Sequence, residues 1–308
     1  IRICLVGSEM CIRDSYDRVC IPVPLYHCFG MVLGTLACCA AGATMIYPSE
    51  GFEPDKTMHA LKSESCTAVH GVPTMFSAML ASSEFNGKPI KSLRTGIMAG
   101  SQCPEVLMRR VLYDLGCSEI TIAYGMTETS PISFQSDVND PVDVRVSTVG
   151  RIQPHCEVKI VEDDGSTCAI GQTGELWTKG YLVMKGYWND TEATQSSIEN
   201  GWMKTGDLAT IDNEGFCRIV GRKKDMVIRG GENIYPAELE EFLTAQKGIL
   251  EAHVFGIPDE KFGEQLVAWI IVEEGAALDE TSIQNLCKNA LAYYKVPAIV
   301  RFVKEVPL

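Results

Sequence analysis

The sequence has too few positive charges to form a nucleic-acid-binding surface. Its 27 Lys and Arg residues are outnumbered by 40 Asp and Glu, so the formal net charge is −13 and the pI is about 4.9. Proteins that bind nucleic acids cluster basic residues on one face or helix, and no such stripe occurs here. The composition therefore excludes nucleic acid as a partner.

Paired cysteine motifs are also missing. The 13 cysteines are scattered, Cys38 and Cys39 are adjacent, and no CxxC pair occurs. This pattern fits neither a disulfide framework nor a zinc site, and it indicates a reducing compartment. We therefore expect the cytoplasm or the mitochondrial matrix.

Long hydrophobic runs are scarce as well. One stretch, residues 19–49, contains no Asp, Glu, Lys or Arg, which raises the possibility of a membrane span. Pro22, Pro24 and His27 interrupt its first half, however, and its second half is rich in Gly and Ala. A buried strand followed by a buried helix describes it better.

The first residues carry no signal-peptide or transit-peptide pattern. Residues 1–17 also resemble nothing expected before a strand that begins at Arg18. We therefore predict that they are a non-native or unassigned segment.

What is present is ordinary globular composition: 308 residues, 46% hydrophobic and 22% charged, enough for about two domains. From residue 18 to 144, short apolar runs alternate with helical patterns, which is typical of a parallel α/β sheet. Strands are expected at CIPVPLYH (20–27), TAVHGVP (67–73), LRTGIMAGS (93–101) and EITIAYG (119–125), and helices at TMFSAMLAS (74–82) and EVLMRRVLYDLG (105–116).

Two further sequence patterns follow along the chain. Residues 145–223 hold short strands joined by DDG and NEG turns, as in a small antiparallel barrel or sheet. Residues 224–308 mix strands with an acidic helix after Pro236 and a helix capped by Asp279, a compact α+β unit. The predicted class is α/β: a large N-terminal domain at 18–223, divided at 144, followed by a small C-terminal domain.

Polar residues gather where the predicted parallel strands end, which is where such sheets bind ligands. In YGMTE (124–128), a tyrosine face suits a base, a threonine hydroxyl suits a phosphate, and Glu128 suits a hard cation. The alternative is a simple turn with a solvated glutamate. His27, in PLYHCFG, is the other candidate of this kind, and its alternative is a buried core histidine.

Two later clusters suit other parts of a nucleotide. In KTGDL, Asp207 has a carboxylate that could accept from both ribose hydroxyls, or the segment could be a capped turn. In GRKKDMVIRGGENIYP, Arg222 could clamp a phosphate or ribose oxygen, and Gly230 and Gly231 allow close approach of a ligand. The alternatives are a tight glycine turn and an exposed basic pair.

Together, in this order, the clusters resemble the core motifs of the adenylate-forming superfamily of acyl-CoA synthetases, luciferases and peptide-synthetase adenylation domains. The resemblance runs from about Arg18 to Leu308 and is carried by YGMTETSP, GELWTKGYLVMKGYW, MKTGDL and GRKKDMVIRGGENIYPAELE. Within the superfamily, PLYHCFG, GVPTMF, VGRIQPH and YKVP are most similar to medium-chain acyl-CoA ligases.

The resemblance implies a role for each matching residue. Tyr124 would stack on adenine, Thr127 would contact the phosphate, and Glu128 would bind Mg²⁺, with Thr127, Glu128 and His27 as the catalytic residues. The remaining implied roles are as follows: ATP or AMP binding by Gly100, Ser101, Gln102, Gly125, Met126, Asp207 and Arg222; the hinge at Lys224; CoA binding at Gly230 and Gly231; and the acyl pocket at His27, Phe29 and Gly125.

The implied reaction has two steps. A carboxylate attacks the α-phosphate of ATP to give acyl-AMP and pyrophosphate, and the CoA thiol then attacks the mixed anhydride after the small domain turns. A carboxylic acid, ATP, Mg²⁺ and coenzyme A are therefore the expected ligands. The superfamily's upstream phosphate loop and its C-terminal lysine segment do not occur in the 308 residues, so we expect a fragment that is poorly active by itself.

Two alternatives remain. The protein could load a carrier protein instead of CoA, or it could be an inert fragment that keeps nucleotide binding; Ile228 and Arg229 disfavour a luciferase-like activity. Because Gly125 stands where a short-acid synthetase has a bulky aromatic residue, the resemblance favours medium-chain acids. The particular acid and the oligomeric state stay open.

Overall fold

The computed structural model describes residues 15–273 and 275–305. The described residues form two compact units, the first made of residues 15–205 and 210–218 and the second of residues 206–209, 219–273 and 275–305. The predicted boundary at Lys224 lies close to this division and stays a prediction.

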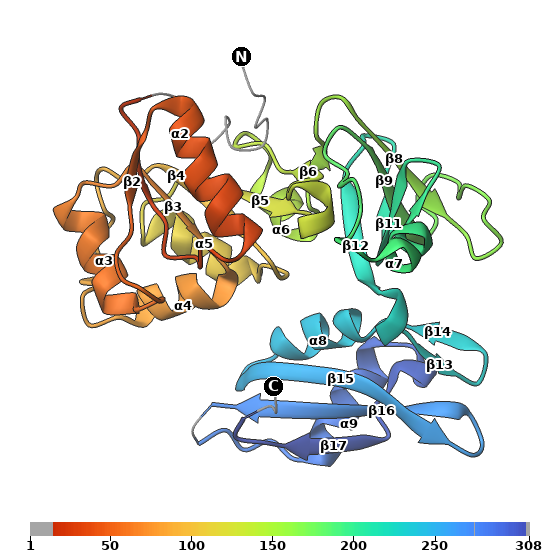
Figure 1. Ribbon diagram of the computed structural model, residues 1–308. Coiled ribbons are helices and arrows are strands. Elements are labelled where there is room, and N and C mark those ends of the chain that lie inside the picture. The colour runs from red at the N-terminus through yellow and green to blue at the C-terminus, as the bar shows by residue number, and fades with distance from the viewer. Residues whose placement is uncertain (1–14, 274, 306–308) are drawn as a thin grey trace. The chain divides into compact units, whose positions relative to one another are not determined.

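The first unit is built on a seven-stranded sheet with the order β2-β1-β3-β4-β5-β6-β7 (Figure 1). The first five strands of this order are mutually parallel, whereas β5–β6 and β6–β7 pair antiparallel. Their bounds are β1 Arg18–Cys20, β2 Thr44–Ile46, β3 Ala68–Gly71, β4 Thr95–Ala99, β5 Glu119–Tyr124, β6 Phe134–Gln135 and β7 Arg151–Ile152. The predicted α/β class is confirmed.

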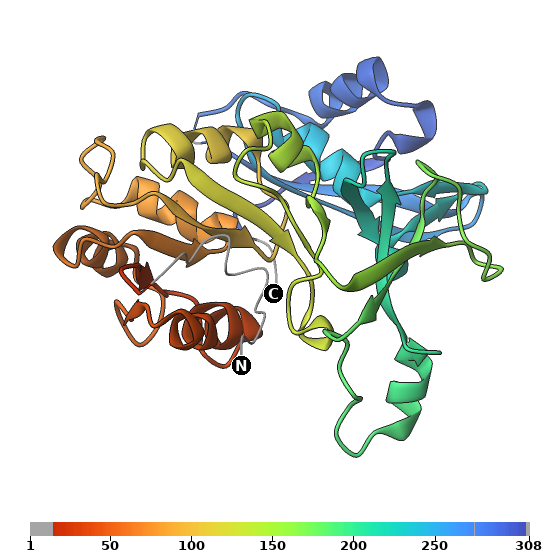
Figure 2. The same ribbon diagram turned by 90° about the horizontal axis from the view of Figure 1, so that it is seen from above.

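Helices cover both faces of this sheet (Figure 2). One core lies under α3, α4 and α5 and includes Met58, Phe76 and Met108, all fully buried. The other lies under η1 and α2 and includes Phe29 and Leu33. The helix bounds are η1 Phe29–Leu36, α2 Ala37–Ala41, α3 Pro54–Ser63, α4 Pro73–Ala81, α5 Glu105–Tyr113 and α6 Val142–Ser147. Because both faces are covered, the strands are continuous apolar runs.

The predicted strand CIPVPLYH is mostly wrong, because β1 ends at Cys20. The N–H of Ile21 still donates to the carbonyl of Ile46 at 2.9 Å. Pro22 and Pro24 then have no N–H to donate, so the ladder stops and the chain continues as a loop to η1. The loop places His27 beyond the sheet edge.

The segment predicted to be non-native or unassigned lies largely outside the described residues, but Asp17 lies inside them. Asp17 is 4% exposed, and its carboxylate accepts from the Thr67 hydroxyl at 2.6 Å and pairs with the Arg94 guanidinium at 2.7 Å. Asp17 is therefore part of the fold of the first unit.

The second sheet is the predicted antiparallel one, with the order β10-β11-β9-β8 and with β12 paired to β11. Its elements are β8 Cys156–Val161, β9 Gly174–Gly180, α7 Thr191–Ser197, β10 Ile198–Glu199, β11 Trp202–Ile211 and β12 Cys217–Arg222. The contact-based division of the chain falls within β11 and β12.

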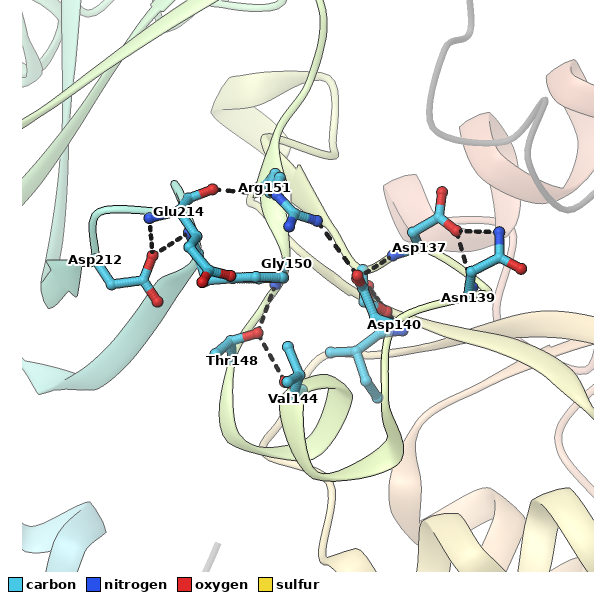
Figure 3. Close-up of polar contacts among 12 residues, drawn as sticks. Asp137, Asn139, Asp140, Val144, Thr148, Gly150, Arg151, Asp212 and Glu214 are labelled. Carbon is cyan, nitrogen blue, oxygen red and sulfur yellow. Dashed lines mark hydrogen bonds and ion pairs between the residues drawn. The ribbon is translucent and has the colours of Figure 1, made fainter.

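Arg151 lies on β7 of the first sheet and contacts the turn between β11 and β12 (Figure 3). Its Nη1 pairs with Asp140 Oδ1 at 3.3 Å, its Nε donates to the Glu214 carbonyl at 3.2 Å, and its guanidinium lies 3.7 Å from the centre of the Phe216 ring. Asp212 shapes the turn itself by accepting the N–H groups of Glu214 and Phe216. All of these residues belong to the first unit.

The second unit contains a third sheet of order β14-β13-β16-β15, in which β17 pairs parallel with β16. Its elements are η3 Lys223–Asp225, β13 Val227–Arg229, β14 Glu232–Ile234, α8 Pro236–Thr244, β15 Ile249–Asp259, β16 Gly263–Val272, α9 Glu280–Ala290, η4 Tyr293–Lys295 and β17 Ile299–Phe302. Asp279 caps α9 as predicted, because its Oδ1 accepts from the Ser282 N–H at 2.7 Å. The predicted α+β composition is confirmed.

Across the two described stretches of the chain, no helix has the length and apolar character that spanning a bilayer requires.

Candidate functional site

The predicted site residues of the first unit lie after strands β1, β4 and β5, which run parallel. The carboxyl ends of these strands therefore meet at one edge of the sheet, as such ligand sites require. The residues placed there are His27 after β1; Gly100, Ser101 and Gln102 after β4; and Tyr124 through Glu128 at the end of β5. Gly100, Ser101 and Gln102 are all exposed, and Gly100 has a φ of +95°.

Thr129 holds the YGMTE turn in shape. Residues 127–129 form the short helix η2 (Thr127–Thr129), and the fully buried Thr129 hydroxyl exchanges hydrogen bonds with the N–H and carbonyl of Met126, both at 3.1 Å. Thr127 is exposed and Glu128 is half-buried, so both side chains stay available at the edge. Tyr124 is half-buried and packs edge-on to Phe134 at 6.1 Å.

Gly125 has a structural reason to be glycine. A Cβ at this position would overlap the Pro131 carbonyl oxygen and lie 2.8 Å from its carbonyl carbon. The chain crosses itself closely here, so the missing side chain does not by itself leave open volume for an acyl group. A role of Gly125 in the acyl pocket stays a prediction.

Cys28, for which the sequence predicts no role, connects two of the loops. Cys28 Sγ lies 3.4 Å from Thr127 Oγ1 and 3.8 Å from His27 Nδ1. The Phe29 N–H donates to His27 Nδ1 at 3.1 Å, and His27 is exposed, so the alternative of a buried core histidine is wrong. The structure therefore brings His27 and Thr127 together through Cys28.

The buried histidine of this unit is His70, on β3. Its side chain is fully buried, it stacks on the buried Phe29 ring at 5.6 Å, and neither ring nitrogen has a hydrogen-bond partner. Burial lowers the pKa of His70 to about 4, because a charged imidazolium would lose its hydration there. Phe29, predicted to line the acyl pocket, lies on this neutral, apolar side of the sheet.

Glu128 has two contacts with the segment that follows β9. The Tyr187 hydroxyl donates to Glu128 Oε1 at 2.8 Å, and the Met184 N–H donates to the Glu128 carbonyl at 2.9 Å. Tyr187 lies in the motif GELWTKGYLVMKGYW, but the sequence predicts no role for it, since nothing in the chain's spacing connects residue 187 to residue 128.

Asp207 on β11 and Arg222 on β12 are close, as their separation by one hairpin predicts. Arg222 Nε lies 3.4 Å from Asp207 Oδ1, with the aspartate side chain 13% exposed and the arginine side chain 63% exposed. The contact is confirmed, whereas binding of one ribose by both residues stays a prediction.

Gly230 and Gly231 form the two-residue turn between β13 and β14. Their φ angles are +62° and +88°, so the hairpin itself requires glycine. Both residues are exposed, and so is Lys224 on η3. Their predicted CoA and hinge roles stay predictions.

A divalent cation would have few protein ligands here. Among residues 15–273 and 275–305, no group of three or more His, Cys, Asp or Glu side chains could hold a metal. Mg²⁺ typically binds through one or two carboxylates together with phosphate oxygens and water. The Glu128 carboxylate, next to the exposed Thr127 hydroxyl, could serve as the protein ligand in such a site.

Sequence comparison gives the class of protein that this fold and site define. The sequence model described as "AMP-binding enzyme" matches residues 3–188, and that described as "AMP-binding enzyme C-terminal domain" matches residues 238–308. The chain belongs to the AMP-binding enzyme family and to the adenylate-forming superfamily. The match beginning at residue 3 includes most of the segment 1–17.

Among named relatives, the chain is 50% identical over 305 residues to "Putative acyl-CoA synthetase YngI" of Bacillus subtilis (strain 168), covering 98% of this chain and 55% of that protein. It is 44% identical over 293 residues to "Medium-chain acyl-CoA ligase ACSF2, mitochondrial" of Danio rerio, covering 94% of this chain and 48% of that protein. The chain thus spans about half the length of these relatives.

A solved structure has the same fold. ATP-bound MatB from Rhodopseudomonas palustris superposes with a TM-score of 0.89 at 30% identity, covering 98% of this chain and 59% of that one. The predicted membership in the superfamily and the arrangement of a larger N-terminal and a smaller C-terminal part are confirmed.

Proposed function

We propose that the protein joins a carboxylic acid to coenzyme A at the expense of ATP, through an acyl-AMP intermediate. The observation that carries this proposal is the YGMTE turn, held at the carboxyl end of β5 in a chain that belongs to the AMP-binding enzymes. The names of the relatives from Bacillus subtilis and Danio rerio, an acyl-CoA synthetase and an acyl-CoA ligase, support it.

In the first unit, we assign the base and the phosphates to the edge of the first sheet. Tyr124 offers a ring face for adenine, bordered by Gly100, Ser101 and Gln102, with Gly125 and Met126 completing the turn. The Thr127 hydroxyl donates to a phosphate oxygen, and Glu128 holds the cation. When bound, Mg²⁺ neutralises charge that develops on the phosphates as pyrophosphate leaves.

In the second unit, we assign the ribose to Asp207 and Arg222. The Asp207 carboxylate is mostly buried and accepts from the vicinal hydroxyls, while Arg222 is exposed enough to turn towards a ribose or phosphate oxygen. The turn at Gly230 and Gly231 faces the CoA arm, and Lys224 is the hinge residue.

For the acid, we propose a medium-chain fatty acid, with His27, Phe29 and Gly125 near the acyl end. Support comes from the name of the Danio rerio relative, a medium-chain acyl-CoA ligase. That name also contains the word mitochondrial, and for this chain the mitochondrial matrix or the cytoplasm remains a prediction.

The test is AMP release by the intact protein with ATP and Mg²⁺, over saturated acids from two to sixteen carbons, with and without CoA. We expect AMP release that needs both acid and CoA and is fastest with acids of about eight carbons. AMP release that is indifferent to CoA would contradict the ligase proposal. A maximum at acetate or at sixteen carbons would contradict the medium-chain assignment alone.

A further inference from the structure

The segment after β9 returns to the edge of the first sheet and contacts Glu128 twice. The Met184 N–H donates to the Glu128 carbonyl at 2.9 Å, and the Tyr187 hydroxyl donates to Glu128 Oε1 at 2.8 Å. The first contact fixes the backbone and the second fixes the carboxylate. This carboxylate is therefore oriented by a residue 59 positions away in the sequence.

Tyr187 is itself held by helix α7. Its N–H donates to Thr194 Oγ1 at 2.9 Å, and that hydroxyl donates to the Asp190 carbonyl at 2.7 Å. Asp190 caps the same helix by accepting the Ala193 N–H at 2.9 Å. The segment is thus anchored by a helix N-terminus before it reaches Glu128.

Gly186 allows this anchoring. Its φ is +150°, and a Cβ there would lie 2.8 Å from Thr194 Cγ2 and 2.9 Å from Thr194 Oγ1. A side chain at 186 would push Thr194 away from the Tyr187 N–H. The glycine and tyrosine of the GYW sequence therefore have linked structural roles.

We infer that Tyr187 is a positioning residue for the cation site: its hydroxyl holds Glu128 Oε1 so that the other carboxylate oxygen, Oε2, faces the divalent cation of a bound nucleotide. The inference rests on the proposed function, in which Glu128 binds that cation. Carboxylates that ligate metals are generally hydrogen-bonded in turn, and loss of such a partner typically lowers metal affinity 10–100-fold. A phenol suits this place because it donates a hydrogen bond and adds no charge.

The test is the Tyr187→Phe variant of the intact protein, which removes one oxygen atom and keeps the ring. Mn²⁺ affinity would be measured by electron paramagnetic resonance in the presence of saturating ATP, and ATP affinity would be measured separately by calorimetry with EDTA. We expect about a tenfold weaker Mn²⁺ affinity and an unchanged metal-free ATP affinity. Tyr113→Phe, at a tyrosine on α5 that is 63% exposed, is the matched control and should change neither.

A second pair of variants separates positioning from folding. Thr194→Ser keeps the hydroxyl that holds Tyr187 and should keep the wild-type Mn²⁺ affinity. Thr194→Val removes it and should weaken Mn²⁺ binding in the same direction as Tyr187→Phe, by a smaller factor. Equal Mn²⁺ affinities in the two Thr194 variants would contradict the anchoring of Tyr187 by α7.

Glu128→Gln distinguishes failure of this inference from failure of the proposed function. If Glu128→Gln leaves Mn²⁺ affinity unchanged, the cation assignment of the proposed function is wrong. If Glu128→Gln weakens Mn²⁺ binding but Tyr187→Phe leaves it unchanged, the positioning role is overturned and the function stands. If Tyr187→Phe tightens Mn²⁺ binding, the hydroxyl competes with the cation, which also overturns the inference.

Discussion

Glu128 at the edge of the first sheet and His70 in its interior are held in opposite ways. At the edge, Glu128 and Thr129 are each bound by a specific partner, Tyr187 and Met126 respectively. In the interior, His70 is fully buried beside Phe29 with neither nitrogen paired. The difference teaches that the edge is organised to hold charge in a fixed direction, whereas the interior tolerates a titratable group because burial keeps it neutral.

The largest expected effect comes from removing the charge at the edge. Glu128→Gln keeps the size of the side chain but not the anionic oxygen, and loss of one such electrostatic group in an active site costs about 10²–10³ in rate. CoA-dependent AMP release measures this effect. The control is Glu50→Gln, which changes an exposed glutamate of the same unit and should leave the rate unchanged. Equal rates in the two variants would remove Glu128 from the mechanism.

Protonation of the buried His70 should have the next largest effect, a loss of folding stability. Because the pKa of His70 is lowered from 6.5 to about 4, the folded protein binds this proton less tightly than the unfolded chain does. The free energy of unfolding therefore falls as pH decreases from about 6.5 to about 4, by roughly 3 kcal/mol for this one group.

Urea unfolding of the wild type and of His70→Leu at pH 7 and pH 4.5 checks this prediction. Other titrating groups contribute equally to both proteins, so the difference between their pH dependences isolates His70. We expect the variant to lose less stability on acidification. Parallel pH dependences would mean that His70 is hydrated or paired in solution.

Adding a side chain at Gly125 should have an intermediate effect on the free energy of unfolding. Gly125→Ala introduces a Cβ that overlaps the Pro131 carbonyl, so the backbone must shift, at a cost of about 1–3 kcal/mol in the free energy of unfolding. Gly51→Ala is the control, because an added Cβ there meets no atom within 4 Å. Chemical denaturation of both variants measures the difference, and similar stabilities would show that the turn yields easily.

The smallest expected effect on stability concerns the second unit. Asp207→Ala should weaken ATP affinity by about 1–3 kcal/mol through lost charge-assisted hydrogen bonds to the ribose. Its free energy of unfolding should change by less than about 1 kcal/mol, because the Arg222 partner is 63% exposed and exposed ion pairs contribute little. Calorimetric ATP titration and urea unfolding separate the two. Unchanged ATP affinity would contradict the ribose assignment.

Local chemistry made much of the fold predictable. Pro236 at the start of α8, the Asp279 cap of α9 and the alternation of apolar strands with helical patterns all act over a few residues, and the structure confirms each of them. The ends of β4 and β5 were predictable for the same reason, which is why Gly100 and Tyr124 were placed correctly at one sheet edge.

The predictions that failed depended on longer-range geometry. The strand CIPVPLYH was predicted too long because its apolar residues outweighed two prolines that cannot pair. The apolar residues around His27 favoured a core position, and only the loop after β1 placed it in solvent. Cys28 carried no signal in the sequence, because its contact with Thr127 spans 99 positions.

By itself, the sequence determined the α/β class, the order of the motifs and the residue types that a nucleotide requires, because propensity, turn chemistry and strand polarity are local properties. Only the tertiary structure decided that Tyr187 holds Glu128, that Gly125 is required by the Pro131 backbone, and that His70 is the buried histidine. Those facts depend on which distant segments pack together, and packing is a property of the whole folded unit and of no short stretch.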